Sequence, residues 1–180
     1  MGAEGIVMGP TSELGPVDPQ ILKVRDKSFQ WFSAFNLVTS YEKLLERAIN
    51  ETGNLPPLLQ QLSYYDPQEI EELRSAIALS DDIAVKALAS GMLQGKSEKQ
   101  IKKDISIFLD PATKKVHGRA VHRGEAEECG LVIMRWENGE SRWRTLYELY
   151  VRTDGLLSSQ NLLKCSETAD DFWVGGSYER

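Results

Sequence analysis

The chain has 180 residues, of which 27 are acidic and 21 are basic, so its formal net charge is −6. An acidic balance argues against a nucleic-acid-binding role, which usually requires a basic face. The length allows one domain with a real core, and no apolar run reaches the roughly 18 residues of a membrane-spanning helix.

The N-terminal part predicts a strand, a loop and a helix. Ile6-Val7-Met8 is typical of a buried strand, and a loop rich in glycine and proline follows over residues 9–20. A helical pattern begins near Asp26 and continues to Ile49, with apolar side chains at helical spacing. Gly53 and the two prolines after it end that helix, because proline cannot continue one.

Two capping patterns predict the helices of the middle of the chain. Asp66-Pro67-Gln68-Glu69 combines an N-cap acceptor, a proline in the first turn and a capping-box glutamate. The long helix that begins there should stop between residues 91 and 95. Ser97 repeats the capping pattern and predicts a third helix that ends at Asp110.

The C-terminal part is less regular. Residues 117–122 should be extended, residues 123–128 should form a short helix, and the apolar run 131–134 should form a buried strand. Asn138-Gly139 is a hairpin turn signal, which favours a strand after it.

The stretch from Glu140 to Arg152 also fits a helix, and we favour the helix. Trp143, Tyr147 and Tyr150 would then lie on one face of a C-terminal helix, either as core residues or as a surface for a partner helix. Residues 155–180 should form an irregular tail.

Several residues invite a catalytic or binding role, and each has a simpler explanation. Ser12 has no neighbouring base, so it is better explained as a turn residue than as half of a Ser12–Lys23 dyad. His117 and His122 are separated by an odd number of positions, which puts them on opposite faces of an extended strand and disfavours a metal site with Glu125. Gly95-Lys96-Ser97 lacks the spacing and the preceding strand of a phosphate-binding loop.

Two segments together resemble a known family. They are EGIVMGPTSELGPVDPQI near the start and VHGRAVHRGEAEECGLVI later in the chain. Both are similar to blocks of the serine dehydrogenase proteinase family, relatives of signal peptide peptidase A within the Clp-protease/crotonase fold. The resemblance covers roughly residues 2 to 150, and the first segment is its most specific part.

The resemblance implies an α/β fold and serine peptide-bond hydrolysis without a cofactor or a metal. It places the nucleophilic serine and the oxyanion loop upstream of Ile6, so the catalytic residues are unknown and this chain alone is expected to be inactive. His117 stands where the family has a histidine, but Gly118 replaces the acidic residue expected after it.

These observations define the expectations for the whole chain. Residues 1–154 would be the C-terminal half of a peptidase domain of the Clp/crotonase type, with few short strands and a mainly helical middle. Self-association or binding to an upstream half is expected, and the substrate of the intact parent would be a peptide. A cytoplasmic location is expected, because Cys129 and Cys165 are too few for a disulfide framework. The alternative is a mainly helical protein-interaction module without catalytic activity.

Overall fold

The computed structural model describes residues 3–25, 28–51, 53–110 and 120–177. The chain is mixed α/β, and the short strands of the described residues form four two-stranded sheets. Two compact units are distinguished: Met1–Ile6 with Ser12–Ile133, and Val7–Thr11 with Met134–Arg180. None of the helices within the described ranges has the length and apolar character needed to cross a membrane.

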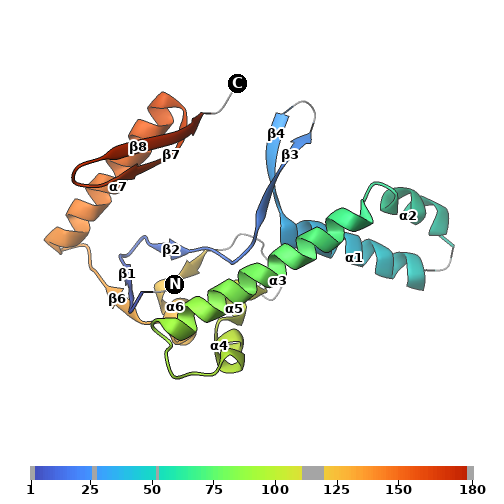
Figure 1. Ribbon diagram of the computed structural model, residues 1–180, viewed down its shortest axis with the longest axis horizontal. Coiled ribbons are helices and arrows are strands. Elements are labelled where there is room, and N and C mark those ends of the chain that lie inside the picture. Colours follow the sequence, from blue (N-terminus) through green and yellow to red (C-terminus); the bar gives the residue numbers. More distant parts are fainter. Residues whose placement is uncertain (1–2, 26–27, 52, 111–119, 178–180) are drawn as a thin grey trace. The chain divides into compact units, whose positions relative to one another are not determined.

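The first unit contains an antiparallel hairpin that the sequence analysis missed. Strand β3 (Gln20–Arg25) pairs with β4 (Ser28–Ser33), and helix α1 (Ala34–Asn50) begins directly after it (Figure 1). The prediction of a helix from Asp26 is therefore wrong. Three of the six residues of β4 are aromatic, which suits a strand, and Ser33 then caps α1 by accepting from the backbone N–H of Asn36 at 3.0 Å.

One face of this hairpin is apolar and exposed. The strand register pairs Leu22 with Trp31 and Val24 with Phe29, so the four side chains lie on the same face. Their exposed fractions range from 49% for Leu22 to 69% for Phe29. On the opposite face, Ile21 packs against the small core between α1 and the long helix α3.

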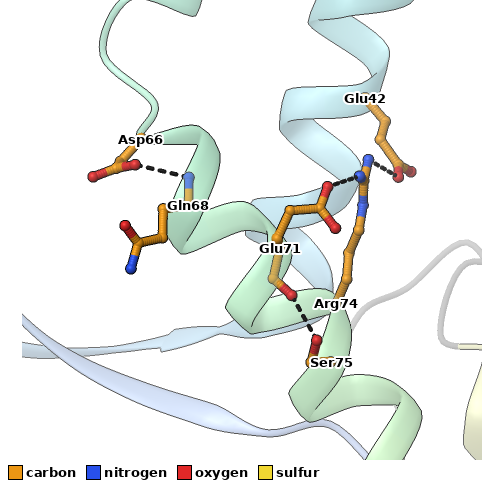
Figure 2. Close-up of polar contacts among 6 residues, drawn as sticks. All are labelled: Glu42, Asp66, Gln68, Glu71, Arg74 and Ser75. Carbon is orange, nitrogen blue, oxygen red and sulfur yellow. Dashed lines mark hydrogen bonds and ion pairs between the residues drawn. The ribbon is translucent and has the colours of Figure 1, made fainter.

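Helices α1 and α3 (Pro67–Ser90) lie side by side (Figure 1). Ala34 and Val38 of α1 and Leu73 of α3 form a buried cluster between them. An exposed ion pair also joins the two helices beside this cluster. Figure 2 shows the guanidinium of Arg74 between two carboxylates, with Glu42 of α1 at 2.8 Å. Helix α2 (Leu55–Leu62) packs on α1 and begins at the two prolines, which the sequence analysis had read only as a helix stop.

The loop of residues 9–20 holds the N-terminus of α1. The Asp18 carboxylate accepts from the backbone N–H of Phe35 at 3.1 Å, and the carbonyl of Pro19 accepts from Ala34 N–H at 2.9 Å. At the other side of the loop, Val17 N–H donates to the carbonyl of Phe108 at 2.8 Å. The Val-Asp-Pro sequence therefore has a structural role, since it satisfies N–H groups that a helix leaves unpaired at its start.

We expect Asp18→Ala to lower the free energy of unfolding by about 1 kcal/mol, because the Phe35 N–H loses its acceptor and the start of α1 loses a carboxylate. Asp18→Asn keeps an acceptor oxygen and should recover most of the loss. Urea unfolding monitored by circular dichroism measures both. Equal midpoints for Asp18→Ala and the wild type would contradict the capping role.

Both predicted caps of the middle helices are confirmed. The Asp66 carboxylate accepts from Gln68 N–H at 2.8 Å at the start of α3 (Figure 2), and Ser97 Oγ accepts from Gln100 N–H at 3.2 Å at the start of α4 (Glu98–Asp104). The predicted third helix is broken at Ile105, after which a short helix α5 (Ser106–Leu109) follows.

Asp81 of α3 is a poorly satisfied carboxylate. Its Oδ2 lies 3.6 Å from Lys102 Nζ, and its Oδ1 is buried with no hydrogen-bond partner among the described residues. Burial raises the pKa of Asp81 above its ordinary 3.8, and Lys102 opposes the shift. Since the folded state binds the proton more tightly than the unfolded state, the contribution of Asp81 to stability is greatest below pH 3.8 and is lost as the pH rises through the raised pKa.

We therefore compare Asp81→Asn with the wild type at several pH values. The difference in unfolding free energy, wild type minus Asp81→Asn, should become more positive as the pH falls from about 7 to about 4.5. Chemical denaturation at each pH gives this difference directly. A constant difference would show that folding leaves the pKa of Asp81 unchanged, and a difference that changes in the opposite direction would show that folding lowers it.

After the segment 111–119, which lies outside the described residues, the chain forms β5 (Val121–His122), α6 (Arg123–Glu128) and β6 (Ile133–Arg135). The predicted helix 123–128 is confirmed, and it ends at Gly130, whose φ of +78° suits glycine. The predicted strand 131–134 begins two residues later and ends one residue later, at Ile133–Arg135, and it is less buried than expected.

In the second unit, the favoured helix is confirmed as α7 (Ser141–Gln160), which runs through Gly155. The expectation of an irregular tail from residue 155 is wrong. Strands β7 (Leu162–Glu167) and β8 (Phe172–Ser177) form an antiparallel hairpin that packs on α7 (Figure 1). Asn161 ends α7 in a left-handed conformation, with φ 57°.

Candidate substrate-binding site

Two strand pairs bring together the segments that carry the family resemblance. Strand β2 (Glu13–Leu14) pairs antiparallel with β5, and β1 (Ile6–Met8) pairs with β6. Ile6 N–H donates to the carbonyl of Val132 at 2.8 Å, and Trp136 N–H donates to that of Met8 at 3.1 Å. Both strands advance in the same direction through these bonds, so the β1–β6 pair is parallel.

An apolar cavity of about 280 Å³ lies in the first unit where these segments meet. Its walls come from both resembling segments and from the helices between them, and every lining residue is apolar: Ile6, Leu14, Gly15, Leu88, Ile105, Phe108 and Leu131. This volume is just below the roughly 300–1,000 Å³ of small-molecule sites. It is suited to an apolar side chain and unsuited to a charged one.

The helical wall of the cavity is firmly packed. Leu88 of α3, Ile105 between α4 and α5, and Phe108 of α5 are at most 2% exposed. The hydrogen bond from Val17 N–H to the carbonyl of Phe108 ties the loop to this wall. A Cβ added at Gly15 would meet no atom within 4 Å, so the wall is open at this residue. The cavity therefore has a buried helical wall and an exposed lining position, Gly15, with space for a larger side chain.

The structure gives Lys23 a partner other than Ser12. Lys23 Nζ lies 2.6 Å from Glu69 Oε1 of α3. The contact of the Lys23 amine is therefore with a carboxylate of α3. Ser12 is the residue directly before β2. The structure thus favours the simpler explanation of Ser12 as a loop residue over a Ser12–Lys23 dyad.

His122 lies at the start of α6, opposite Glu13 in the β2–β5 register. Its backbone N–H donates to Glu125 Oε2 at 3.3 Å, so Glu125 acts as a helix cap. His117 lies outside the described residues. Within the described ranges, no three or more His, Cys, Asp or Glu side chains gather as a metal site would require.

The Gly95-Lys96-Ser97 sequence has structural roles. Gly95 takes a φ of +94°, and Ser97 caps α4. Lys96 Nζ pairs with Asp104 at 2.9 Å, and together with Gln100 this pairing lowers the pKa of the Asp104 carboxyl. These contacts account for all three residues without a phosphate ligand.

Comparison with known proteins gives no assignment. No protein-family model, no curated protein and no solved structure matches the chain. The resemblance of the two segments therefore remains an interpretation of the sequence.

The sequence analysis identified the loop but not the helical wall of the cavity. Leu88, Ile105 and Phe108 belong to the apolar pattern of the predicted middle helices, and such a pattern indicates burial and nothing more specific. Their position beside Leu14 and Leu131 depends on strand pairing between segments more than a hundred residues apart. No local signal in the sequence reports such pairing.

Proposed function

We propose that the chain is the C-terminal part of a serine peptidase-like protein of the Clp-protease/crotonase type. One observation carries the proposal: the two resembling segments, distant in the sequence, are paired through β1–β6 and β2–β5 and share an apolar cavity. Segments that jointly form a substrate site must be adjacent in space, and these two are.

In this proposal the chain contributes substrate binding, and the resemblance assigns the nucleophile to residues upstream of Ile6. The cavity would hold an apolar side chain of the peptide, since every residue that lines it is apolar. The loop of residues 9–20, held by Val17 and Asp18, would keep Leu14 and Gly15 in position. Hydrolysis would then require the serine and the oxyanion donors of the upstream segment.

Labelling with a fluorophosphonate probe tests the proposal, because the probe reacts with activated serine hydroxyls. The two samples are this chain and a form extended by the coding sequence upstream of Met1. Labelling of the extended form alone supports the proposal. Labelling of this chain, at Ser12 or elsewhere, shows that the nucleophile is misplaced. Absence of labelling from both contradicts a peptidase.

A matched pair of variants tests the cavity in the extended form. A leucine-containing peptide should protect the wild type from the probe. Gly15→Phe should abolish that protection, because the new ring occupies the cavity wall. Gly124→Phe is the control, since a Cβ there also meets nothing within 4 Å but Gly124 does not line the cavity. Equal protection in both variants would exclude the cavity as the binding site.

A further inference from the structure

The turn that precedes α7 contains the dipeptide Asn138-Gly139, and both residues are exposed. A hydrogen bond from Glu140 N–H to the carbonyl of Glu137 closes the turn at 3.0 Å. The side chain of Glu140 also accepts from Glu137 N–H, at 2.9 Å. Within the described residues, no hydrogen bond uses the carboxamide of Asn138 or the N–H of Gly139. Both groups are therefore open to water and to reaction with each other.

An asparagine side chain can react with the backbone nitrogen of the residue that follows it. This nitrogen loses its proton to a base in solution and attacks Cγ, so that a C–N bond forms and the side-chain nitrogen leaves as ammonia. Water then opens the cyclic imide on either side, which gives aspartate or isoaspartate. The reaction consumes water, releases ammonia and changes no oxidation state. Glycine in the second position favours ring closure, because it has no Cβ to crowd the nitrogen and its backbone rotates freely.

The other asparagines lack this combination of exposed turn and following glycine. Asn36 and Asn50 belong to helix α1. Asn54 lies at the start of α2, and Asn161 lies at the end of α7. Each of them is followed by leucine or glutamate, whose side chain crowds the attacking nitrogen. The chain therefore offers this reaction a single favourable asparagine.

Asp154-Gly155 is the comparison that depends on the structure. An aspartate can close the same ring with loss of water, and here too the next residue is glycine. This pair lies inside α7, where each backbone N–H donates to a carbonyl of the preceding turn. Ring closure would require the helix to open locally. The structure thus separates two glycine-containing pairs that the sequence alone leaves equivalent.

We infer that Asn138 is a site of spontaneous deamidation, at which water converts the carboxamide into a carboxylate through a cyclic imide formed with Gly139. The aspartate product adds a negative charge to the groove that Asn138 lines together with Arg144. The isoaspartate product adds a methylene carbon to the main chain of the turn, which disrupts the bond between Glu140 N–H and the Glu137 carbonyl. The inference is independent of the peptidase proposal, so either can fail alone.

Peptide mapping by mass spectrometry tests the inference on the full chain, incubated in mildly alkaline buffer and sampled over time. Trypsin releases Asn138 within residues 136–142. This peptide should gain the mass difference between NH₂ and OH, and isoaspartyl methyltransferase should label it. The peptide that contains both Asp154 and Asn161 should stay unmodified and unlabelled. The rate at Asn138 should rise with pH, because the Gly139 nitrogen attacks only after it has lost its proton.

A matched pair of variants tests the role of Gly139. Gly139→Ala should lose most of the modification over the same interval, because the new methyl group crowds the attacking nitrogen. Gly155→Ala is the control and should be modified at Asn138 like the wild type. A Cβ meets nothing within 4 Å at either glycine, so neither change disturbs packing.

Three results would overturn the inference. An Asn138 that stays intact in the folded chain overturns the site, and its reaction in urea would then show that the folded turn protects it. Equal rates in Gly139→Ala and the wild type overturn the participation of Gly139. Formation of aspartate without any isoaspartate overturns the cyclic imide, because water opens that ring on both sides.

Discussion

Replacing Leu88 by alanine should lower the free energy of unfolding by about 3 kcal/mol, within the roughly 2–5 kcal/mol range of buried Leu→Ala changes. Leu88 is only 1% exposed and forms part of the cavity wall. Its removal enlarges a cavity that already exists, so the lost contacts are not replaced by other side chains. Equilibrium denaturation in urea measures the loss, and the slope of the transition should stay unchanged.

Leu79→Ala in the same helix is the control. Leu79 is 59% exposed, so the same change in composition and helix propensity should cost less than about 1 kcal/mol. The contrast between the two variants isolates packing from helix propensity. Similar losses of unfolding free energy in both variants would show that Leu88 is not packed in the core. They would also contradict its place in the wall of the cavity.

Gly9→Ala should destabilise the second unit by about 1–3 kcal/mol through overpacking. A Cβ at Gly9 would lie 2.3 Å from ring carbons of Trp143, far inside van der Waals contact. The indole must therefore move, which also changes its contact with the ring of Tyr147, whose centroid lies 5.6 Å away. Tryptophan fluorescence and near-UV circular dichroism report the change around the indole, and thermal unfolding reports its cost.

Gly139→Ala serves as the comparison for Gly9→Ala. Gly139 is also in the second unit, and a Cβ there meets nothing within 4 Å. This variant should keep the wild-type spectra and unfolding temperature. Unchanged spectra in Gly9→Ala as well would show that Trp143 does not pack against Gly9 in solution.

Local signals predicted most of the helices. Asp66 and Ser97 were identified as N-caps from their own short sequences, and the structure shows both accepting the expected backbone N–H. Periodicity also distinguished helix from strand for α7, even though Asn138-Gly139 favoured a hairpin. In each case the deciding interactions lie within a few residues of one another, so the sequence contains them directly.

The two antiparallel hairpins could not be predicted in the same way. The segment before α1 carries apolar residues that also fit a helix, and pairing of β3 with β4 decided between the two. Beyond Gly155 the polar composition favoured a tail, but Leu162–Glu167 pairs with Phe172–Ser177, and Lys164 lies 5.4 Å from the ring centroid of Trp173. These cross-strand contacts stabilise strands whose own sequences are ambiguous.

The sequence by itself determined most of the helices, the caps at Asp66 and Ser97 and the loop of residues 9–20 that is rich in glycine and proline. Only the tertiary structure decided where that loop lies: β1 against β6, β2 against β5, and Leu14 and Gly15 in the wall of an apolar cavity. The physical reason is the range of the interactions. A cap is a hydrogen bond between near neighbours, whereas the cavity forms only when segments from four parts of the chain pack together, and no single segment encodes that arrangement.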